Sequence, residues 1–323
     1  MSLIRIFSFA AGLGALAACS VAQSSSGTGP LPQSAGSRSA AAAVTLAKKA
    51  APIVFASDAG SGTVYAFSDE GAFPQLWAMS GAPLAYPGPL YVDGSADLYV
   101  ADQSGSVFAY AAPGPSGPPG APSFTYSNPA GEMSQVAVCG DYVYASDVQD
   151  GADGAAFTVW TKGTAAPLRV VSQANYQNGA GLGIVCAGND VYFAYSLSYE
   201  GPDAVDRYAA GGTGSPTTVS VPFSATFTLD ESATQVVTGA IDFYTFPGSK
   251  LVRSLSRKTD AWIDNPLAFA FEPKDKALWD ADGSTQTLNR FTSKGKLLGQ
   301  ITKPTSGSFV SLGGVAVSPP DHD

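Results

Sequence analysis

The stretch Leu98-Tyr-Val-Ala-Asp102, followed by Gln-Ser-Gly-Ser and Val107-Phe-Ala-Tyr110, has counterparts along most of the chain. Its pattern predicts a strand, a tight turn and a second strand, and we call the first of these the anchor strand. The other anchor strands are Val54–Asp58, Val143–Asp147, Val191–Tyr195, Val236–Ala240 and Leu278–Asp282. The last residues of the six copies lie 44, 45, 48, 45 and 42 residues apart, and strand-rich units of this length predict a propeller or a solenoid.

Each unit is predicted to contain four short strands. An apolar strand precedes the anchor strand, as at Leu90–Asp93, and two strands follow it, as at Val107–Tyr110 and Ser123–Tyr126. The first anchor strand has no apolar strand before it, whereas the last apolar strand, Val315–Ser318, has no anchor strand after it. We therefore predict an all-β, six-bladed propeller of four-stranded antiparallel blades, closed by pairing the C-terminal strand with the N-terminal blade.

Composition limits the classes of partner. The chain has 323 residues, of which 45% are hydrophobic and 13% charged, and its 36 glycines and 23 prolines suit short strands joined by turns. A net charge of -9 argues against nucleic-acid binding, because an acidic surface repels phosphates. We expect a monomer with no nucleic-acid partner.

The N-terminus has the pattern of an export signal. Residues 1–18 combine Arg5, an apolar run from Ile6 to Leu16 and small residues before Cys19. This run is shorter than the ~20 residues that span a bilayer. Residues 19–50 are rich in Ser, Ala and Gly and are predicted to be a flexible tether. The propeller is predicted over residues 51–319, with a tail at 320–323.

The ending Leu16-Ala17-Ala18-Cys19 resembles the lipobox of bacterial lipoproteins. That resemblance implies cleavage before Cys19, lipidation of Cys19 and anchoring in the bacterial cell envelope. In a two-membrane bacterium, Ser20 at the next position implies the outer membrane. The alternative is an ordinary signal peptide with an incidental cysteine.

The repeat, with Gly-Val-Ala-Val in the apolar strand and Leu-Tyr-Val-Ala-Asp in the anchor strand, resembles NHL-repeat and gluconolactonase-like six-bladed propellers. The resemblance covers Pro52 to Pro319, and the anchor strands ending in Tyr195 and Ala240 depart from it. The resemblance implies a six-bladed propeller fold. Propellers of this kind include binding proteins and enzymes, so function depends on the site.

The four aspartates that end anchor strands have a structural interpretation, in which each carboxylate accepts backbone hydrogen bonds at a turn. They are Asp58, Asp102, Asp147 and Asp282. The turn containing Asp147, Asp150 and Asp153 offers three carboxylates for Ca²⁺, but it lacks EF-hand spacing. A solvated turn is the favoured interpretation there.

His322 is the only histidine, which excludes catalysis by a Ser/His/Asp triad and a His-ligated zinc. Lactone hydrolases of the gluconolactonase type use carboxylate and amide ligands on a calcium-like ion. The resemblance to that family makes Glu132, Asn178 and Asn265 candidate ligands, with Asp93 or Asp230.

Cys139 and Cys186 occupy equivalent positions in successive units. We expect two buried thiols, because equivalent positions in adjacent blades are often farther apart than the ~5.5 Å between the Cα atoms of a disulfide. The alternative is a bridge, since Cys19 is consumed by lipidation and leaves an even pair.

The loops that enter the apolar strands should meet at one mouth of the channel. They place there Tyr86, Glu132, Asn178, Gly179, Phe223, Asn265 and Ser311. Of these, Tyr86, Glu132, Asn178, Asn265 and Ser311 are the candidate ligand-binding residues, because aromatic and amide groups suit a peptide or a sugar. Tyr176, Tyr195, Tyr199 and Trp262 are expected at the same rim. The opposite rim, with Asp93 and the two cysteines, is expected to be structural.

These features predict a lipid-anchored envelope protein whose propeller is a binding module for an envelope protein, a peptide or a glycan. The two alternatives are a metal-dependent lactone hydrolase and a purely structural envelope protein.

Overall fold

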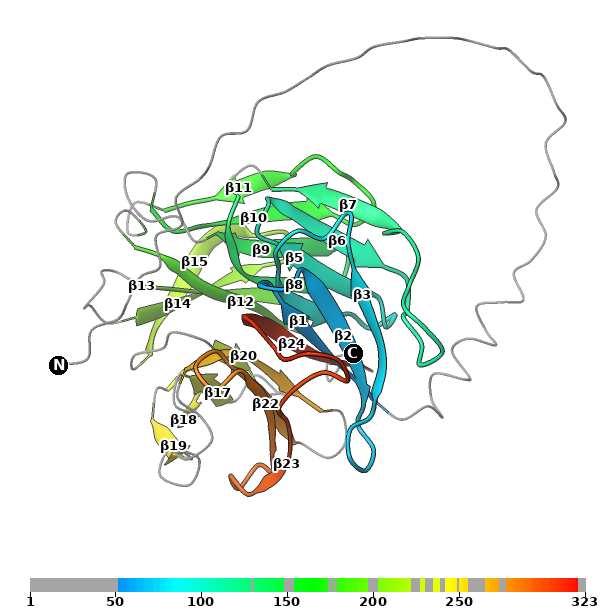
Figure 1. Cartoon of the computed structure of the whole chain (residues 1–323). Coiled ribbons are helices and arrows are strands. Elements are labelled where there is room, and N and C mark those ends of the chain that lie inside the picture. Colours follow the sequence, from blue (N-terminus) through cyan, green and yellow to red (C-terminus); the bar gives the residue numbers. More distant parts are fainter. Residues whose placement is uncertain are drawn as a thin grey trace, which may run out of the picture. The chain divides into compact units, whose positions relative to one another are not determined.

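The computed structural model describes residues 52–128, 131–147, 154–173, 176, 179–196, 203–221, 227–229, 235–238, 242–248, 250–254, 265–272 and 277–318. The chain divides into units of residues 1–46 and 47–323, and every described residue belongs to the second unit. Its strands form six four-stranded antiparallel sheets, which confirms the predicted all-β propeller (Figure 1). Within the described residues, no helix is long and apolar enough to cross a membrane.

We number the blades I to VI, and each is given from its innermost to its outermost strand. Blade I contains β24 (Leu312–Ser318), β1 (Ile53–Asp58), β2 (Thr63–Ser68) and β3 (Gln75–Ser80). Blade II contains β4 (Pro87–Val92), β5 (Leu98–Asp102), β6 (Ser106–Tyr110) and β7 (Phe124–Ser127). Blade III contains β8 (Met133–Cys139), β9 (Tyr142–Asp147), β10 (Ala156–Thr161) and β11 (Arg169–Val171).

The remaining blades follow in chain order. Blade IV contains β12 (Gly181–Ala187), β13 (Asp190–Ser196), β14 (Asp203–Ala209) and β15 (Thr213–Val221). Blade V contains β16 (Phe227–Leu229), β17 (Gln235–Thr238), β18 (Asp242–Thr245) and β19 (Leu251–Ser254). Blade VI contains β20 (Pro266–Phe271), β21 (Leu278–Asp282), β22 (Thr287–Phe291) and β23 (Leu297–Ile301). Five blades therefore use four consecutive strands, and blade I combines both ends of the described chain.

The innermost strands form a closed ring. Each contacts the next in the order β24, β4, β8, β12, β16 and β20, and β20 contacts β24 again. The anchor strands β1, β5 and β21 behind them are buried along their whole length, with successive side chains pointing to opposite neighbours. In β1, Phe55 packs in one cluster with residues of blade II, while Val54 packs in another with residues of blade VI. Burial between blades thus provides the core.

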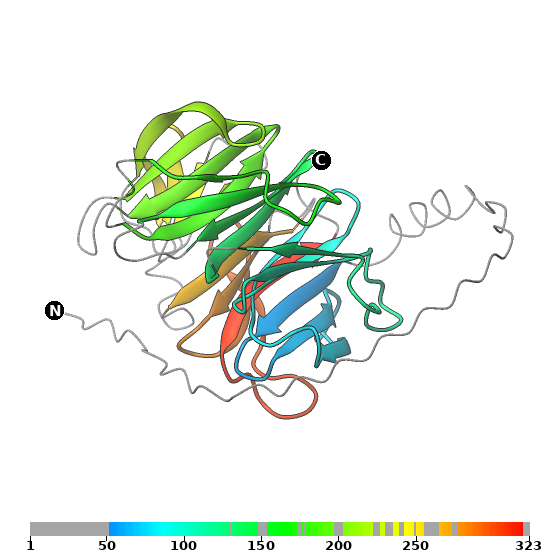
Figure 2. The same cartoon turned by 90° about the horizontal axis from the view of Figure 1, so that it is seen from above.

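Pairing of β24 with β1 completes blade I. The register runs from Ile53 opposite Ser318 to Asp58 opposite Leu312. Figure 2 shows the C-terminal strand, in red, beside the N-terminal strands, in blue. The predicted closure between the C-terminal strand and the N-terminal blade is confirmed.

A β-bulge interrupts the pairing of the innermost strand in five blades. The register shift lies between Pro87 and Leu90 in β4, between Met133 and Gln135 in β8, and between Gly181 and Gly183 in β12. The same irregularity occurs in β20 and in β24, where Gly313 is the extra residue. Since a bulge bends the strand that carries the extra residue, each of these strands is redirected where it enters the ring.

Cys139 and Cys186 form a disulfide, which corrects the expectation of two free thiols. Their Cα atoms are 5.7 Å apart, within the range that a bridge requires. The expectation failed because β8 and β12 are innermost strands of adjacent blades, where blades approach most closely. The bridge joins blade III to blade IV.

Removing this bridge should lower the free energy of unfolding. We expect the Cys139→Ala, Cys186→Ala double variant to lose about 2–4 kcal/mol, because the bridge closes a loop in the unfolded chain. Denaturant unfolding of the variant and of the reduced wild-type protein measures the loss. Identical unfolding midpoints for the oxidised and reduced wild-type proteins would contradict the prediction.

Candidate functional site

The aspartate at the end of the blade II anchor strand holds the loop that enters its own innermost strand. Asp102 is fully buried, and its Oδ2 accepts hydrogen bonds from the backbone N–H groups of Ala85 and Tyr86 at 2.8 and 2.9 Å. Its Oδ1 accepts a bond from the N–H of Ser104, inside its own turn, at 2.9 Å. One buried carboxylate thus fixes two backbone segments.

Blades I and VI repeat this arrangement. Asp58 accepts hydrogen bonds from the N–H groups of Val310 and Ser311 at 3.0 and 2.7 Å. Asp282 accepts one from the N–H of Asn265 at 2.8 Å. Both also accept bonds from N–H groups of their own turns. The predicted turn-stabilising role is confirmed for these aspartates, and the same carboxylates also hold the neighbouring loop.

The fixed loops present exposed side chains at one end of the ring. We call Tyr86, Val310, Ser311, Asn265 and Leu267 the entry rim, because they lie where β4, β24 and β20 begin. Tyr86 is 60% exposed, Val310 61% and Leu267 37%, although all three are large apolar residues. Blades VI, I and II adjoin in that order through β20, β24 and β4. The entry rim therefore combines apolar and amide groups on three neighbouring blades.

Glycines in the turns make room for two of these side chains. A Cβ on Gly60 would lie 2.6 Å from Cγ1 of Val310, and one on Gly283 would lie 2.6 Å from Cδ1 of Leu267. Leu267 is also the extra residue of the β20 bulge, since Pro266 pairs with Asp282 and Ala268 pairs with the residue before it. Local backbone geometry therefore sets the positions of the exposed groups.

The candidate ligand-binding residues are only partly brought together. Tyr86, Asn265 and Ser311 lie at equivalent positions of blades II, VI and I and are exposed. Glu132 is exposed just before β8, and its loop is held to Asp147 by the side chain of Asn128, whose Nδ2 donates to Oδ1 of Asp147 at 2.7 Å. Asn178 lies outside the described residues, as do Phe223, Tyr199, Trp262 and Asp230.

Tyr176 and Tyr195 were expected at the rim, and this expectation is wrong. They are 0% and 1% exposed. Their hydroxyls donate hydrogen bonds to the buried carboxylate of Asp206, at 2.5 and 3.4 Å. The buried carboxylate needs donors inside the blade, which draws both phenols into the core. Burial raises the pKa of both tyrosines, so their hydroxyls remain protonated donors.

Asp147 differs from the other anchor aspartates. Its carboxylate accepts hydrogen bonds from Nδ2 of Asn128 at 2.7 Å and from Oγ1 of Thr158 at 3.0 Å. Burial raises the pKa of Asp147 to about 6, against the lowering effect of these two donors. Asp150 and Asp153 lie outside the described residues. Among residues that the structure describes, no three His, Cys, Asp or Glu side chains are grouped to hold a metal ion.

The raised pKa makes a pH-dependent contribution to stability. Between about pH 4, near the unfolded pKa, and pH 6, the folded state binds more protons, so stability decreases as pH rises through this window. Asp147→Asn should remove this decrease, which amounts to at most about 3 kcal/mol at 1.36 kcal/mol per pKa unit. The amide can accept from Asn128 and donate to Thr158, whose hydroxyl then donates to Oδ1 of Asn128 at 3.1 Å.

Unfolding free energies at pH 4 and pH 7 measure the effect. Glu70→Gln, which makes the same change from carboxylate to amide at an exposed position, is the matched control. An Asp147→Asn variant with an unchanged difference between the two pH values would show that this carboxyl does not titrate in the window.

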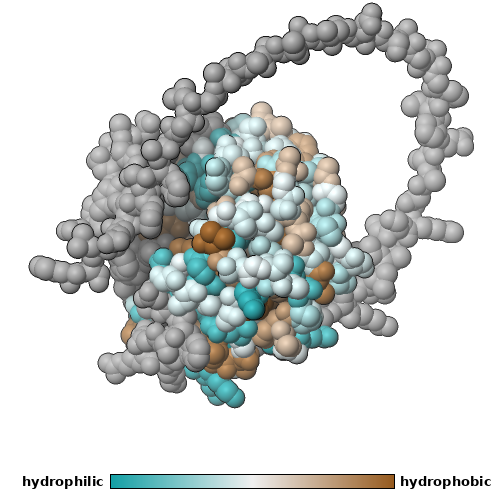
Figure 3. Space-filling view, viewed as in Figure 1, coloured by the Kyte–Doolittle hydropathy of each residue, from teal (hydrophilic) through white to brown (hydrophobic). Residues whose placement is uncertain are grey.

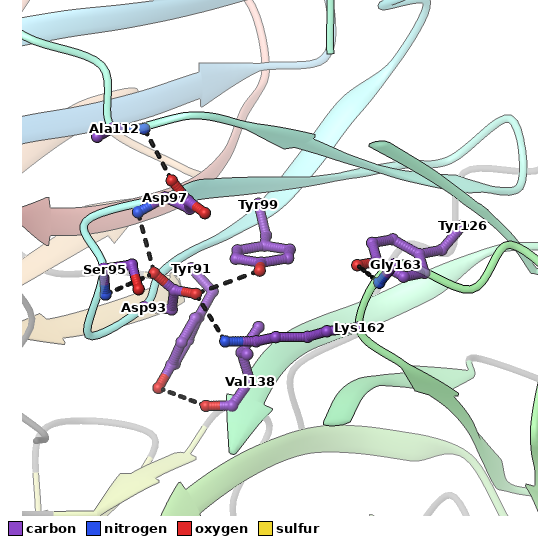
Figure 4. Close-up of polar contacts among 10 residues, drawn as sticks. All are labelled: Tyr91, Asp93, Ser95, Asp97, Tyr99, Ala112, Tyr126, Val138, Lys162 and Gly163. Atoms are coloured by element: carbon purple, nitrogen blue, oxygen red, sulfur yellow. Dashed lines mark hydrogen bonds and ion pairs between the residues drawn. The ribbon is translucent and has the colours of Figure 1, made fainter. Parts of the chain in front are cut away.

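The opposite end of the ring is held by contacts between blades. Asp93, at the end of β4, is 3% exposed, and its Oδ2 accepts hydrogen bonds from Nζ of Lys162 at 2.9 Å and from the hydroxyl of Tyr99 at 3.2 Å (Figure 4). Its Oδ1 accepts the N–H groups of Ser95 and Asp97. Since Lys162 follows β10, this ion pair joins blade II to blade III.

Residues at the positions equivalent to Asp93 in other blades make two further connections between blades. Glu272, just after β20, makes a two-point ion pair with Arg290, at 2.5 and 2.6 Å, and Arg290 also contacts Asp69 of blade I at 3.1 Å. The Cys139–Cys186 bridge lies at the same level of the ring. We call Asp93, Cys139, Cys186 and Glu272 the exit rim. Their side chains are used in structural contacts.

The central channel is narrow and mainly apolar. A cavity of about 80 Å³ is lined from all six innermost strands by residues that include Tyr91, Gln135, Ile184, Thr228 and Phe269. Oε1 of Gln135 accepts a hydrogen bond from the N–H of Ile184 at 2.9 Å. None of the described lining residues is a carboxylate, and Gln135 and Thr228 are the lining residues with polar oxygen-bearing side chains other than Tyr91.

Side-chain amides between blades were not anticipated. Gln103 accepts the N–H of Met133 at 2.9 Å and donates to its carbonyl at 2.7 Å, which imitates strand pairing between blades II and III. Oε1 of Gln286 accepts the N–H of Leu312 at 2.8 Å. Both glutamines lie in the turns that follow anchor aspartates. Their position in the turn after an anchor strand could have indicated this role from the sequence, because backbone groups of the next blade need hydrogen-bond donors and acceptors there.

No known protein-family model matches this chain, and no curated protein matches its sequence. Solved structures do match its fold. A chain from a nidogen/laminin complex has a TM-score of 0.61 and 14% identity, covering 84% of this chain and 100% of that one. A protein of unknown function from Bacteroides caccae has a TM-score of 0.58 and 11% identity, covering 83% and 99%.

A functionally unknown protein from Desulfotomaculum acetoxidans is also similar, with a TM-score of 0.55 and 12% identity, covering 83% of this chain and 99% of that one. At these identities the likeness shows the fold alone. Together, the fold and the comparisons define this protein as a β-propeller.

Proposed function

We propose that this protein is an interaction module of the bacterial cell envelope, which binds another envelope protein through the entry rim. The observation that carries the proposal is the exposure of Tyr86, Val310 and Leu267 on backbone held by three buried aspartates. Exposed apolar and aromatic groups on a rigid support are typical of binding hot spots, because little conformational entropy is lost on binding.

The position of these groups supports recognition of a protein partner. Asn265 and Ser311 add hydrogen-bonding groups beside the apolar ones. Such a mixture suits the rim of a protein interface. One structurally similar propeller comes from a complex of nidogen with laminin, which supports this use of the fold.

Two features support export to the envelope. The Cys139–Cys186 bridge suits an oxidising compartment, because structural disulfides are rare where thiols are kept reduced. The sequence Leu16-Ala17-Ala18-Cys19 has the lipobox pattern. In this proposal Cys19 is lipidated and anchors the chain to the membrane, with the outer membrane favoured where there are two. Residues 19–50 are the tether between anchor and propeller.

Lipidation can be tested by fractionation. Cys19→Ala should move the protein from the membrane fraction to the soluble fraction, because a tether rich in Ser, Ala and Gly provides no other membrane contact. Immunoblots of salt-washed membranes from the two strains measure the distribution. Ser20→Ala, which leaves the acceptor cysteine intact, is the control. Retention of Cys19→Ala in washed membranes would contradict the anchor.

The binding surface can be tested in cells with the full chain. A photo-crosslinking amino acid placed at Tyr86 or Val310 should give one discrete adduct, whereas the same group at Leu298 should give none. Leu298 is a suitable control because it is 44% exposed on the outermost strand of blade VI.

The partner identified in this way is then purified for binding measurements. Tyr86→Ala and Val310→Ser should each weaken its affinity about tenfold or more, since truncation of a hot-spot residue costs about 2 kcal/mol. Leu298→Ala should leave the affinity unchanged. Adducts at all three positions, or equal affinities for all variants, would place the binding surface elsewhere or favour a purely structural protein.

A further inference from the structure

A groove separate from the entry rim lies between blades I and II. It has a volume of about 490 Å³ and lies between the end of β3 with its following turn and the loop that joins β6 to β7. Its walls include Met79, Leu84, Tyr110, Pro118 and Pro122. The volume lies within the roughly 300–1,000 Å³ that small-molecule sites occupy. The central cavity, at about 80 Å³, is too small for a comparable ligand.

The walls of the groove are held in place. Nε1 of Trp77 in β3 donates a hydrogen bond to the carbonyl of Gly114 at 2.8 Å, which fastens the β6–β7 loop to blade I. At its other end, the N–H and the hydroxyl of Ser123 donate to the carbonyl of Ala109 at 2.8 and 3.0 Å. Prolines within the loop fix φ and lower the entropy lost on ordering. The groove is therefore preformed.

The chemistry of the walls selects against charged ligands. None of the described lining residues is charged, and Ser80 and Tyr110 are the only ones among them with a polar side chain. A charge placed against such walls would gain no oppositely charged side chain to offset its lost hydration. The groove thus suits a neutral molecule with a large apolar surface.

Tyr110 provides one unused donor. Its side chain is 1% exposed and lines the groove, and its hydroxyl has no hydrogen-bond partner among the described residues. Burial and the nearby charge of Asp102 raise the pKa of Tyr110 to about 12, so the hydroxyl keeps its proton at neutral pH. A buried donor without a partner is unfavourable, and an acceptor in the groove would remove that cost.

We propose that the groove binds a neutral, mainly apolar molecule through a carbonyl or ether oxygen that accepts a hydrogen bond from Tyr110. The oxygen faces the phenol while the apolar body lies against Met79, Leu84 and the prolines. The proposal does not rest on a partner bound at the entry rim.

Two probes of the same shape test the donor. These are 2-acetylnaphthalene, which has a carbonyl oxygen, and 2-isopropenylnaphthalene, in which a CH₂ group replaces that oxygen. Titration of the full chain should show about fivefold tighter binding of the ketone, the factor that one net hydrogen bond provides. Tyr110→Phe should reduce ketone affinity to that of the hydrocarbon, and its melting temperature should equal or exceed the wild-type value.

Two further variants locate the site. Ala121→Trp, on the exposed wall of the groove, should abolish binding of both probes while the protein remains folded. Tyr126→Phe is the matched control, because Tyr126 is also buried but accepts a hydrogen bond from the N–H of Gly163 at 3.2 Å and packs on the other side of blade II. It should leave both affinities unchanged.

Three results would overturn the proposal. Equal affinity of the two probes for the wild-type protein would show that the Tyr110 hydroxyl does not contribute to binding. Binding that survives Ala121→Trp would place the probes elsewhere. Absence of binding by either probe up to its solubility limit would show that the groove is not a ligand site.

Discussion

The pairing of β24 with β1 is the constraint on which the rest of the structure depends. It joins residues at the two ends of the described chain, with Val54 opposite Val317, and it supplies blade I with its innermost strand. Through that strand, β20 of blade VI and β4 of blade II contact the same element. Without it, apolar residues such as Val315 and unpaired backbone groups of β1 would be exposed, which is the usual liability of a sheet edge.

Once the ring is closed, its two ends are stabilised by different interactions. At the exit rim, side chains themselves form the contacts, as in the Asp93–Lys162 and Glu272–Arg290 ion pairs and the disulfide. At the entry rim, the buried aspartates bind backbone N–H groups, so the side chains of Tyr86 and Val310 remain exposed. On the face drawn in Figure 3, hydrophobic residues occur as small separate groups. Exposed apolar side chains on fixed backbone, such as those of Tyr86 and Val310, are therefore the better candidates for a binding surface.

The repeat predicted the architecture because both of its signals are local. Alternating side chains set the strands, and the position of the unmatched strand Val315–Ser318 required closure. The turn-binding role of Asp58, Asp102 and Asp282 followed from the same pattern. Of the predicted site, Tyr86, Asn265 and Ser311 are exposed at the mouth, because a loop entering an innermost strand must begin at one end of the ring.

The features that the sequence did not predict depend on distances between blades. The disulfide requires 5.7 Å between the Cα atoms of β8 and β12, a value that the ring determines and no single repeat contains. Burial of Tyr176 depends on Asp206, thirty residues away in the next strands of the blade. The groove beside Tyr110 depends on a loop from blade II that is fastened to Trp77 of blade I.

Glycine in the innermost strands determines where a ligand can bind. A Cβ on Gly314 would lie 2.8 Å from the carbonyl oxygen of Gly88, and one on Gly183 would lie 2.3 Å from Oε1 of Gln135. At Gly314 the backbones of β24 and β4 approach too closely for a side chain, at Gly183 the space is taken by the side chain of Gln135, and the central cavity is about 80 Å³. Since little room remains at the axis, a partner or a ligand of ordinary size must bind outside it. The entry rim offers exposed groups away from the axis, and the groove between blades I and II offers space there.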